Sequence, residues 1–556
     1  MNLRRRALLA APALALVLLT SACGSSDAAD SGDAAGTRSG GAVTNSATSS
    51  ADATPTEGGS LSFAVANDPI SLNPSGIGSG NDTLYVTRQL FDSLTEQDPE
   101  TGEIIPWLAE TFGASDDATS FTFTLREGVT FSDGTPLTAE SVKATFDDIK
   151  AAGANAQAGA QFLGAYDRTE VTDDRTFTVH FTAPNGSFLQ GVSSVALAPV
   201  AASTLAIPFD QRATGEGVIG TGPFVLDHYT KNTEVVLTKR DDYDWGPGDR
   251  ENTGAAHLDE VVFKIVPESG VRTGSLDSGQ VQVIGGVAPQ DNAGLEAAGH
   301  NLVVRANPGI SFGLTAVETQ PIVADEQVRL AIARAINATD VRDAVLDDHF
   351  AVATSPLAAN TPGWVDLSAD LAFDPEQAAS LLDEAGWTGG DGDVRTKDGQ
   401  PLHLVIGYIS NFGPNQGALE LIQQQLRDVG IEAELWTGTV PDYLAAIKDG
   451  KIDLAWGNLS RADGDVLRTQ YSTASSNYYK IDDPELEAAL VGQASTADPD
   501  KRAEFQATAQ ELLVTRGHTI PVHELTTVLG ADPSVHGVVL GADSRLSQLT
   551  DAFIAE

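Results

Sequence analysis

The stretch of residues 121–142, which reads FTFTLREGVTFSDGTPLTAESV, constrains the fold more than any other part of this chain. Phe121, Phe123 and Leu125 alternate with threonine, which is the period-two pattern of a strand with one buried face. Arg126-Glu127-Gly128 breaks that pattern and ends the strand. These apolar side chains therefore predict a sheet whose inner face packs against other elements.

A turn and a helix are expected to follow this strand directly. Residues 129–131 predict a second short strand, and Asp133-Gly134 is typical of a tight turn. Pro136 has no backbone N–H and bars the chain from continuing in the sheet. Thr138 is expected to cap the helix that comes next. The order strand, turn, strand, turn and helix indicates mixed α/β structure.

The rest of the chain alternates strands with helices in the same way, which favours α/β lobes. Strands are predicted over 61–65, 233–237, 261–266, 303–314 with a break at 307–309, and 431–436; helices are predicted over 326–336, 376–384, 416–429 and 499–516. The roughly 500 residues beyond Gly58 are too many for one hydrophobic core. Length alone therefore predicts two to four lobes.

The segment 121–142 closely resembles the signature of the family 5 extracytoplasmic solute-binding proteins, the peptide and nickel receptors of ABC importers. Further family-like segments follow in order at 90–94, 102–110, 220–224, 328–331, 335–337, 374–378, 381–382, 385–387 and 427–431. The resemblance covers nearly everything after residue 60. Relatives usually carry an asparagine after the apolar strand near residue 315, whereas this chain has Val317-Glu318. No contact is therefore carried over from that asparagine to this chain.

The resemblance implies an α/β fold, the large type II form of the two-lobed periplasmic-binding-protein fold with an inserted third subdomain. The N-terminal lobe would comprise residues 59–98, 217–304 and 526–556, the inserted subdomain 99–216, and the second lobe 305–525. The chain would cross between the lobes twice and form a hinge that closes over a ligand. A receptor of this kind needs no catalytic step and no cofactor, works with an ABC permease, and is expected to be a monomer.

The best candidate for a ligand-binding segment is 455–465. It follows the strand-like residues 452–454 and is expected to be the loop at the carboxyl end of a strand, where open α/β sheets bind ligands. Its candidate residues are Trp456, Gly457, Asn458, Arg461, Asp463 and Asp465. In the family's peptide receptors the comparable segment supplies a carboxylate that pairs with the peptide's amino group. Asp463 matches that position best and Asp465 second.

Structural roles for the same side chains remain open. Either aspartate could pair with Arg461 or cap the next helix, and Trp456 could stack on a ligand or close the core. Arg461 and Arg468 would also suit the carboxylates of a metal chelator, so a nickel or other chelate is an alternative ligand. A short peptide is the favoured solute.

Further ligand contacts are expected from the facing lobe and from one loop of the second lobe. The facing lobe offers Gly78, Ser79, Gly80 and Asn81, ahead of a helix that contains Tyr85; the second lobe offers Asn411 and Phe412. Glycines let the backbone approach a ligand, and a helix start has free N–H donors. The other interpretation of these residues is a surface turn.

The first 58 residues predict export and a lipid anchor. Three arginines at 4–6, an apolar run at 7–19 and small residues at 20–22 are typical of a signal peptide over 1–22. Cys23, the only cysteine, follows directly and resembles the lipidation site of a bacterial lipoprotein. Residues 23–58 are rich in Ser, Ala, Gly, Thr and Asp, and predict a disordered tether. The expected location is the outer face of the cell membrane, reached by either the Sec or the Tat route.

Charge and motif content exclude several other functions. The formal net charge is −44, from 77 acidic and 33 basic residues, which disfavours nucleic-acid binding. The acidity could indicate a cationic ligand, although distributed surface acid more often serves solubility. The nine histidines show no close pair with metal-ligand spacing, so no metal site is predicted. A secreted hydrolase is disfavoured because the chain has no nucleophile elbow and no zinc-protease motif.

Overall fold

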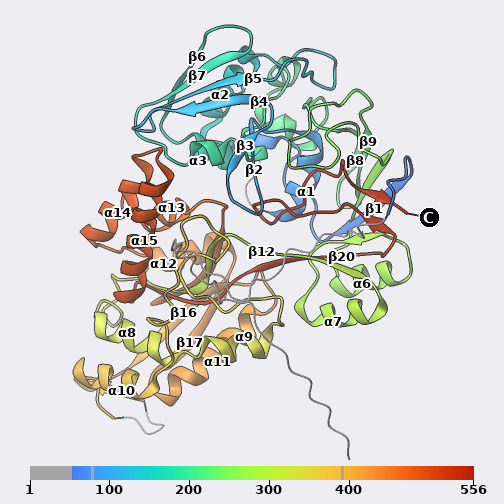
Figure 1. Cartoon of the computed structure of the whole chain (residues 1–556). Coiled ribbons are helices and arrows are strands. Elements are labelled where there is room, and N and C mark those ends of the chain that lie inside the picture. Colours follow the sequence, from blue (N-terminus) through green and yellow to red (C-terminus); the bar gives the residue numbers. More distant parts are fainter. Residues whose placement is uncertain (1–52, 77–79, 390–393, 556) are drawn as a thin grey trace, which may run out of the picture. The chain divides into compact units, whose positions relative to one another are not determined.

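The computed structural model describes residues 53–76, 80–389 and 394–555 (Figure 1). The predicted signal peptide, Cys23, most of the tether, Gly78 and Ser79 lie outside the described residues. Within the described part, two large sheets and one smaller sheet carry most of the strands. Each is covered by helices, so the prediction of mixed α/β lobes is confirmed.

The first large sheet has seven strands in the order β12-β20-β11-β1-β10-β9-β8. Their bounds are β1 Ser60–Val65, β8 Phe224–Thr230, β9 Glu234–Lys239, β10 Glu260–Ile265, β11 Val283–Ile284, β12 Asn301–Ala306 and β20 Thr526–Ala531. Strand β1 pairs in parallel with β10 and β11. We call this sheet and its helices the first lobe.

Alternation along β1 determines which helices cover which face of this sheet. Leu61, Phe63 and Val65 belong to the core shared with helix α1 (Asn81–Leu90). Ala64 points the other way and joins the core that includes residues of α6 (Ser269–Asp277) and α7 (Pro289–Ala298). Both faces are therefore buried, as expected for a sheet in a layered α/β lobe.

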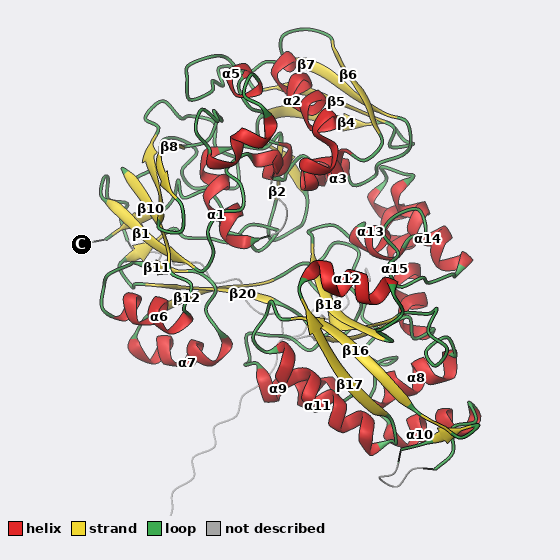
Figure 2. Ribbon diagram, turned by 180° about the vertical axis from the view of Figure 1, so that it is seen from behind, coloured by secondary structure: helices red, strands yellow, loops and turns green. Residues whose placement is uncertain are grey.

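The second large sheet has five strands in the order β17-β16-β18-β13-β19. Their bounds are β13 Gly309–Ala316, β16 His403–Ile409, β17 Glu432–Gly438, β18 Leu454–Ser460 and β19 Thr519–His523. One core contains residues of α8 Glu326–Ala335, α9 Ala338–Val345, α10 Pro375–Glu384 and α11 Asn415–Asp428. A separate core contains residues of α12 Val440–Lys448, α13 Val466–Tyr471, α14 Pro484–Ala494 and α15 Pro499–Thr515. This sheet and these helices form the second lobe (Figure 2).

The third sheet has four antiparallel strands in the order β4-β5-β7-β6. We call this sheet, together with α2–α5, the inserted subdomain. The bounds are β4 Ala109–Ala114, β5 Ser120–Leu125, β6 Tyr166–Val171, β7 Thr176–Phe181, α2 Ala139–Ala152, α3 Gln157–Leu163, α4 Phe188–Gly191 and α5 Ala202–Leu205. Phe121, Phe123 and Leu125 are buried while Thr122 is exposed, which confirms the predicted alternation.

The helix cap predicted at Thr138 is also confirmed. The Thr138 hydroxyl accepts from the backbone N–H of Ser141, and the Ser141 side chain accepts from the Thr138 backbone N–H. The second strand predicted over 129–131 is wrong, because only Thr130 forms an isolated bridge, with Pro136. Pro136 has no N–H to extend that pairing, so Val129 and Phe131 are buried without belonging to a strand.

Short strands complete the described structure. They are β2 Thr95–Gln97 with β3 Ile104–Pro106, β14 Thr396–Lys397 with β15 Gln400–Pro401, and β21 Val535–His536 with β22 Phe553–Ile554. The helices predicted over 326–336, 376–384, 416–429 and 499–516 correspond to α8, α10, α11 and α15, with ends that differ by one residue at most.

The chain passes between the two large sheets at two places. Strand β12 of the first sheet leads through Asn307-Pro308 into β13 of the second, and β19 of the second leads through Glu524-Leu525 into β20 of the first. Gly309 begins β13 with a φ of 108°, a backbone conformation that favours glycine. Two short connections of this kind are what a hinge requires. In the described part of the chain, no helix combines the length and apolarity needed to cross a bilayer.

Candidate functional site

A cavity of about 190 Å³ lies in the second lobe. It is bounded by residues of β13 and β18, by the segments that follow the carboxyl ends of the parallel strands β16 and β17, and by helices α12 and α13. The carboxyl ends of parallel strands are where open α/β sheets bind ligands. The lining residues are Ile310, Phe312, Thr315, Ile409, Asn411, Asn415, Val440, Tyr443, Leu444, Ile447, Ala455, Trp456, Gly457, Asn458, Gln470, Tyr471, Tyr478 and Tyr479.

Trp456 both lines the cavity and closes the core behind it. Its side chain is 1% exposed and stacks on Phe312 with ring centroids 5.7 Å apart. The indole Nε1 donates to Asn415 Oδ1 at 3.0 Å, and the Tyr443 hydroxyl donates to the Trp456 carbonyl at 3.3 Å. These contacts hold the indole in one orientation, so it forms a rigid wall of the cavity.

The polar groups of the lining side chains are amides, phenols, the Trp456 indole N–H and one threonine hydroxyl, and none of these side chains is an acid, a base or a histidine. Gln470 Nε2 donates to the Tyr479 hydroxyl at 2.6 Å, and Asn415 Nδ2 donates to the Ile409 carbonyl at 3.2 Å. Burial raises the pKa of Tyr443, Tyr471 and Tyr479, so these phenols stay neutral. The cavity therefore presents an uncharged surface.

Three of the predicted site residues lie in a strand and not in a loop, which corrects the sequence analysis. Trp456 pairs with Leu314 and Gly457 with Gly313, so β18 continues to Ser460 and carries Trp456, Gly457 and Asn458. The glycine and asparagine in this stretch concealed the strand, because both residues are uncommon in strands. The loop expected at 455–465 begins only at Arg461.

Asp463 has a partly buried cationic partner, Arg502, in the same lobe. Its Oδ1 accepts from Arg502 Nη2 at 2.7 Å and from the backbone N–H of Asp465 at 2.7 Å. Asp465 accepts two hydrogen bonds from Arg468, both at 2.7 Å, and stands at the N-cap position of α13. Neither aspartate pairs with Arg461, the partner that the sequence analysis considered. A peptide amino group at Asp463 would have to share that carboxylate with Arg502.

Arg461 is the one cation of this loop region without a carboxylate partner in the described part of the chain. Its Nη1 donates to Thr469 Oγ1 at 2.9 Å, and its guanidinium lies over the Phe162 ring at 5.2 Å. Burial lowers the pKa of Arg461, since little solvent surrounds the charge. This guanidinium could bind an anionic group that enters beside it.

The inserted subdomain contacts the same part of the second lobe. Ser187 Oγ donates to Asp465 Oδ2 at 3.2 Å, and the backbone N–H of Gly186 donates to the Ala494 carbonyl at 2.9 Å. Gln97, from β2, donates through Nε2 to the Ala462 carbonyl at 2.9 Å. Together with Phe162 over Arg461, these contacts join two parts of the chain that lie far apart in sequence.

Among the described residues, none of the first-lobe candidates is part of the cavity lining. Gly80 and Asn81 lie at the start of α1, where Gly80 has a φ of 145°. Tyr85 is buried in the core of the first lobe with its ring 5.8 Å from Phe63. Asn411 lines the cavity, whereas Phe412 stacks behind it on Phe312 at 5.5 Å.

The structure thus brings Trp456, Gly457, Asn458 and Asn411 together at one cavity and places Asp463, Asp465 and Arg461 in the loop beyond it. Sequence reasoning missed the tyrosines and Gln470. The pair Tyr478-Tyr479, eight residues after Gln470, was the only local signal.

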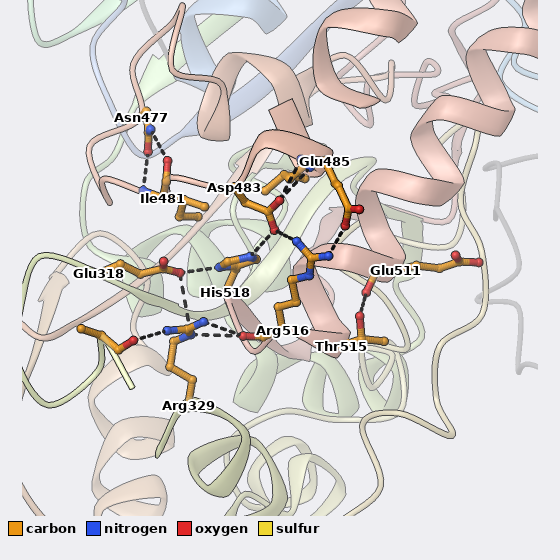
Figure 3. A network of polar contacts seen from close by, with 12 residues as sticks. Glu318, Arg329, Asn477, Ile481, Asp483, Glu485, Glu511, Thr515, Arg516 and His518 are labelled. Atoms are coloured by element: carbon orange, nitrogen blue, oxygen red, sulfur yellow. Dashed lines mark hydrogen bonds and ion pairs between the residues drawn. The ribbon is translucent and has the colours of Figure 1, made fainter. Parts of the chain in front are cut away.

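A buried polar network elsewhere in the second lobe explains the departure at Val317-Glu318 (Figure 3). His518 contacts Glu318 through Nδ1 and Asp483 through Nε2, the latter at 3.2 Å. Burial alone would raise the pKa of Asp483, but hydrogen bonds from the Leu486 backbone, Arg516 and His518 hold it below the usual range. Glu318 therefore has a structural role here and is not itself one of the cavity-lining residues.

In the described ranges, no group of three or more His, Cys, Asp or Glu side chains could hold a metal ion.

Comparison with known proteins agrees with this architecture. Residues 103–480 match the family of bacterial extracellular solute-binding proteins, family 5. The dipeptide-binding protein of Escherichia coli (strain K12) is 26% identical over 514 residues, covering 86% of this chain and 92% of that protein. The nickel-binding periplasmic protein of the same strain is 26% identical over 413 residues, covering 71% of this chain and 76% of that protein.

A solved structure shares the fold. The crystal structure of NikA from Brucella suis in complex with Fe(III)-EDTA superposes with a TM-score of 0.76 at 24% identity, covering 88% of this chain and 100% of that chain. The predicted type II periplasmic-binding-protein fold is therefore confirmed. Members of the family are transport receptors and not enzymes, which also confirms that expectation. The chain belongs to family 5 of the bacterial extracellular solute-binding proteins and is a non-enzymatic, extracytoplasmic receptor for an ABC importer.

Proposed function

We propose that this protein captures a short peptide between its lobes and delivers it to an ABC permease. The observation that carries the proposal is the cavity whose lining has amides, phenols and aromatic rings but no ionised group. Amides can donate to and accept from a peptide backbone, and the rings can contact its side chains. The dipeptide-binding relative, which spans 86% of this chain, supports the same assignment.

The charges beside the cavity also fit a peptide. Asp463 and Asp465 are each compensated by an arginine, whereas Arg461 has no carboxylate partner among the described residues. A guanidinium in that position would bind a terminal carboxylate through paired hydrogen bonds. The proposed lobes, 59–98 with 217–304 and 526–556 on one side and 305–525 on the other, would close on the peptide through the crossings at 307–308 and 524–525.

Native mass spectrometry of protein purified without denaturation tests this proposal. A heterogeneous set of copurified short peptides would support it. A single non-peptide mass would contradict it. Isothermal titration calorimetry with tripeptides, after removal of copurified solute by unfolding and refolding, then gives the affinity.

A metal chelate is the second candidate solute. It is favoured by the uncompensated Arg461, which could bind a chelator's carboxylate, and by the nickel-binding relative. A single metal complex in the native mass spectrum would establish it. The cavity lining disfavours a chelate, because the carboxylates of a chelator gain little binding free energy from an uncharged wall.

We also infer a lipid anchor at Cys23, a tether over 23–58 whose last two residues contact His257, and a monomeric state. The signal-like sequence of 1–22 followed directly by the only cysteine supports the anchor. Replacing Cys23 with Ser should release the protein from the membrane fraction into the medium or periplasm. Continued attachment of the C23S variant would contradict the anchor, and sedimentation of the soluble part tests the monomer.

A further inference from the structure

The size of the cavity limits what it can hold. Its volume is about 190 Å³, whereas sites that enclose a whole drug-sized ligand measure ~300 to 1,000 Å³. An engineered protein cavity of ~150 Å³ is enough for benzene. The cavity therefore accommodates one ring-sized group of a larger ligand.

We propose that this cavity is a subsite for one aromatic side chain of the bound peptide. The inference rests on the proposed peptide-binding function and deepens it by naming the class of peptide. The bound aromatic ring would pack against Trp456, with Tyr443 and Tyr471 beside it. Offset and edge-to-face contacts between rings are favourable beyond the area they bury, so an aromatic guest gains more here than an aliphatic guest of similar size.

The uncharged lining excludes ionised side chains. A lysine or glutamate side chain placed here would lose its water and find no opposite charge, a cost that an aromatic ring does not incur. The neutral phenols of Tyr443, Tyr471 and Tyr479 cannot compensate either kind of charge. The cavity thus discriminates by charge as well as by shape.

The rim gives an independent indication that something apolar covers it. Val440 and Tyr478 are 52% and 42% exposed, which makes them two of the few large hydrophobic side chains left open in the described structure, and both line the cavity. A ring that enters between them would bury part of this surface. The amide of Asn458 makes no hydrogen bond to another described residue, so it is free to bind a phenol hydroxyl, an indole N–H or the adjacent backbone.

Gly457 allows the cavity to be filled without disturbing the strand. A Cβ added at Gly457 meets no atom within 4 Å, and its φ lies outside the range that disfavours other residues. Gly457→Leu should therefore project a side chain into the cavity while β18 stays paired. Gly113→Leu is the matched control, because Gly113 is also an exposed strand glycine where an added Cβ meets no atom within 4 Å, but it lies in the inserted subdomain.

Calorimetric titration of the full-length soluble protein with Ala-Phe-Ala, Ala-Trp-Ala, Ala-Leu-Ala, Ala-Lys-Ala and Ala-Glu-Ala tests the inference, with the variable residue also moved to the first and last positions. At one position the aromatic peptides should bind roughly tenfold or more tightly than the charged ones, and several-fold more tightly than the leucine peptide. G457L should lose this preference, and G113L should retain it.

The outcomes separate the inference from the function on which it rests. Equal affinity for all five peptides, or an unchanged preference in folded G457L, overturns the aromatic subsite and leaves peptide binding intact. A single non-peptide mass in the native mass spectrum, with no binding of any of the five peptides, overturns both. If G457L does not fold, the wild-type comparison decides alone, since a preference for lysine, glutamate or leucine contradicts the inference.

Discussion

The ion pair between Asp463 and Arg502 is the clearest case in which single residues determine the structure of the candidate binding loop. Their side chains are 8% and 16% exposed, and the donor and acceptor lie 2.7 Å apart. Opposite charges that are removed from water compensate each other, whereas one such charge without its partner lowers the free energy of unfolding. The aspartate that resembles a ligand-binding residue is thus also needed by its own lobe.

Asp463→Asn should therefore destabilise the protein even without ligand. We expect the free energy of unfolding in urea to fall by about 3 kcal/mol, because Arg502 keeps its charge and loses its partner. The double variant D463N/R502Q should recover part of that loss, since it removes both charges. Additive effects of D463N and R502Q in this cycle would show that the pair does not couple.

A second residue-scale effect lies in the hinge segment after β19. Burial lowers the pKa of His523 to about 4 and raises that of Glu524 to about 7. The folded state favours the protonated form of Glu524. Its contribution to the free energy of unfolding is therefore lost as the pH rises from the pKa of Glu524 in the unfolded chain, near 4.5, to its pKa in the folded protein, about 7. His523 has the opposite effect on stability. Because the folded state favours its neutral form, the free energy of unfolding increases as the pH rises from about 4 to 6.5, the pKa of His523 in the unfolded chain.

The effects of Glu524 and His523 on the pH dependence of stability largely cancel in the wild-type protein. Glu524→Gln removes the first effect and should reveal that of His523. Relative to wild type, E524Q should gain up to roughly 3 kcal/mol of unfolding free energy between about pH 4.5 and about pH 7.5. Urea unfolding of both proteins across that range measures the difference. A constant difference between wild type and variant would mean that Glu524 titrates normally.

At the scale of elements, the connection from the inserted subdomain back to β8 depends on two glycines. A Cβ on Gly220 would lie 2.2 Å from the Leu90 carbonyl oxygen, and one on Gly222 would lie 2.5 Å from the Leu90 carbonyl carbon. The Gly222 backbone N–H also donates to the Leu90 carbonyl at 3.0 Å. The family-like segment 220–224 therefore needs glycine so that its backbone can pack directly on the end of α1.

Gly222→Ala should lower the free energy of unfolding by about 3 kcal/mol, at the upper end of the cost of overpacking, because the clash is with backbone and not with a movable side chain. Gly113→Ala should change it by less than ~1 kcal/mol, since that Cβ meets nothing. Thermal and urea unfolding of the two variants provide the comparison. Similar stabilities for both would contradict the close packing.

At the scale of the whole described structure, the contacts between the inserted subdomain and the second lobe are those that a closed receptor would use. Gly186 sits against the connection from α14 to α15, where an added Cβ would lie 2.7 Å from the Thr496 carbonyl oxygen. Ser187 and Phe162 contact the loop that carries Asp465 and Arg461. Under the proposed function, closure and ligand capture would be linked through the same few residues.

Gly186→Val should hinder this approach while leaving each lobe folded. We expect the affinity for the preferred tripeptide to fall about tenfold, which corresponds to about 1.4 kcal/mol, since the ligand must then work against a clash to close the lobes. Small-angle scattering should show a smaller ligand-induced compaction than in wild type. Wild-type affinity in G186V would show that this contact plays no part in closure.

Local patterns predicted most of the elements, and they singled out a candidate segment of which Trp456, Gly457 and Asn458 line the cavity. The alternation at Phe121, Phe123 and Leu125 and the cap at Thr138 depend only on neighbours in sequence, so they can be recognised from the sequence alone. The extension of β18 through Gly457 was missed because its pairing with β13, which lies far earlier in the chain, outweighs the weak strand propensity of glycine and asparagine.

The sequence by itself determined that this chain builds layered α/β lobes, and it predicted a candidate binding segment at residues 455–465. The tertiary structure alone decided that Asp463 pairs with Arg502, that the tyrosines of α12, α13 and residues 478–479 surround one cavity, and that Glu524 lies in a dry hinge. The physical reason is that partners, enclosed volume and desolvation depend on how distant segments pack, whereas strands and capped helices depend on residues a few positions apart.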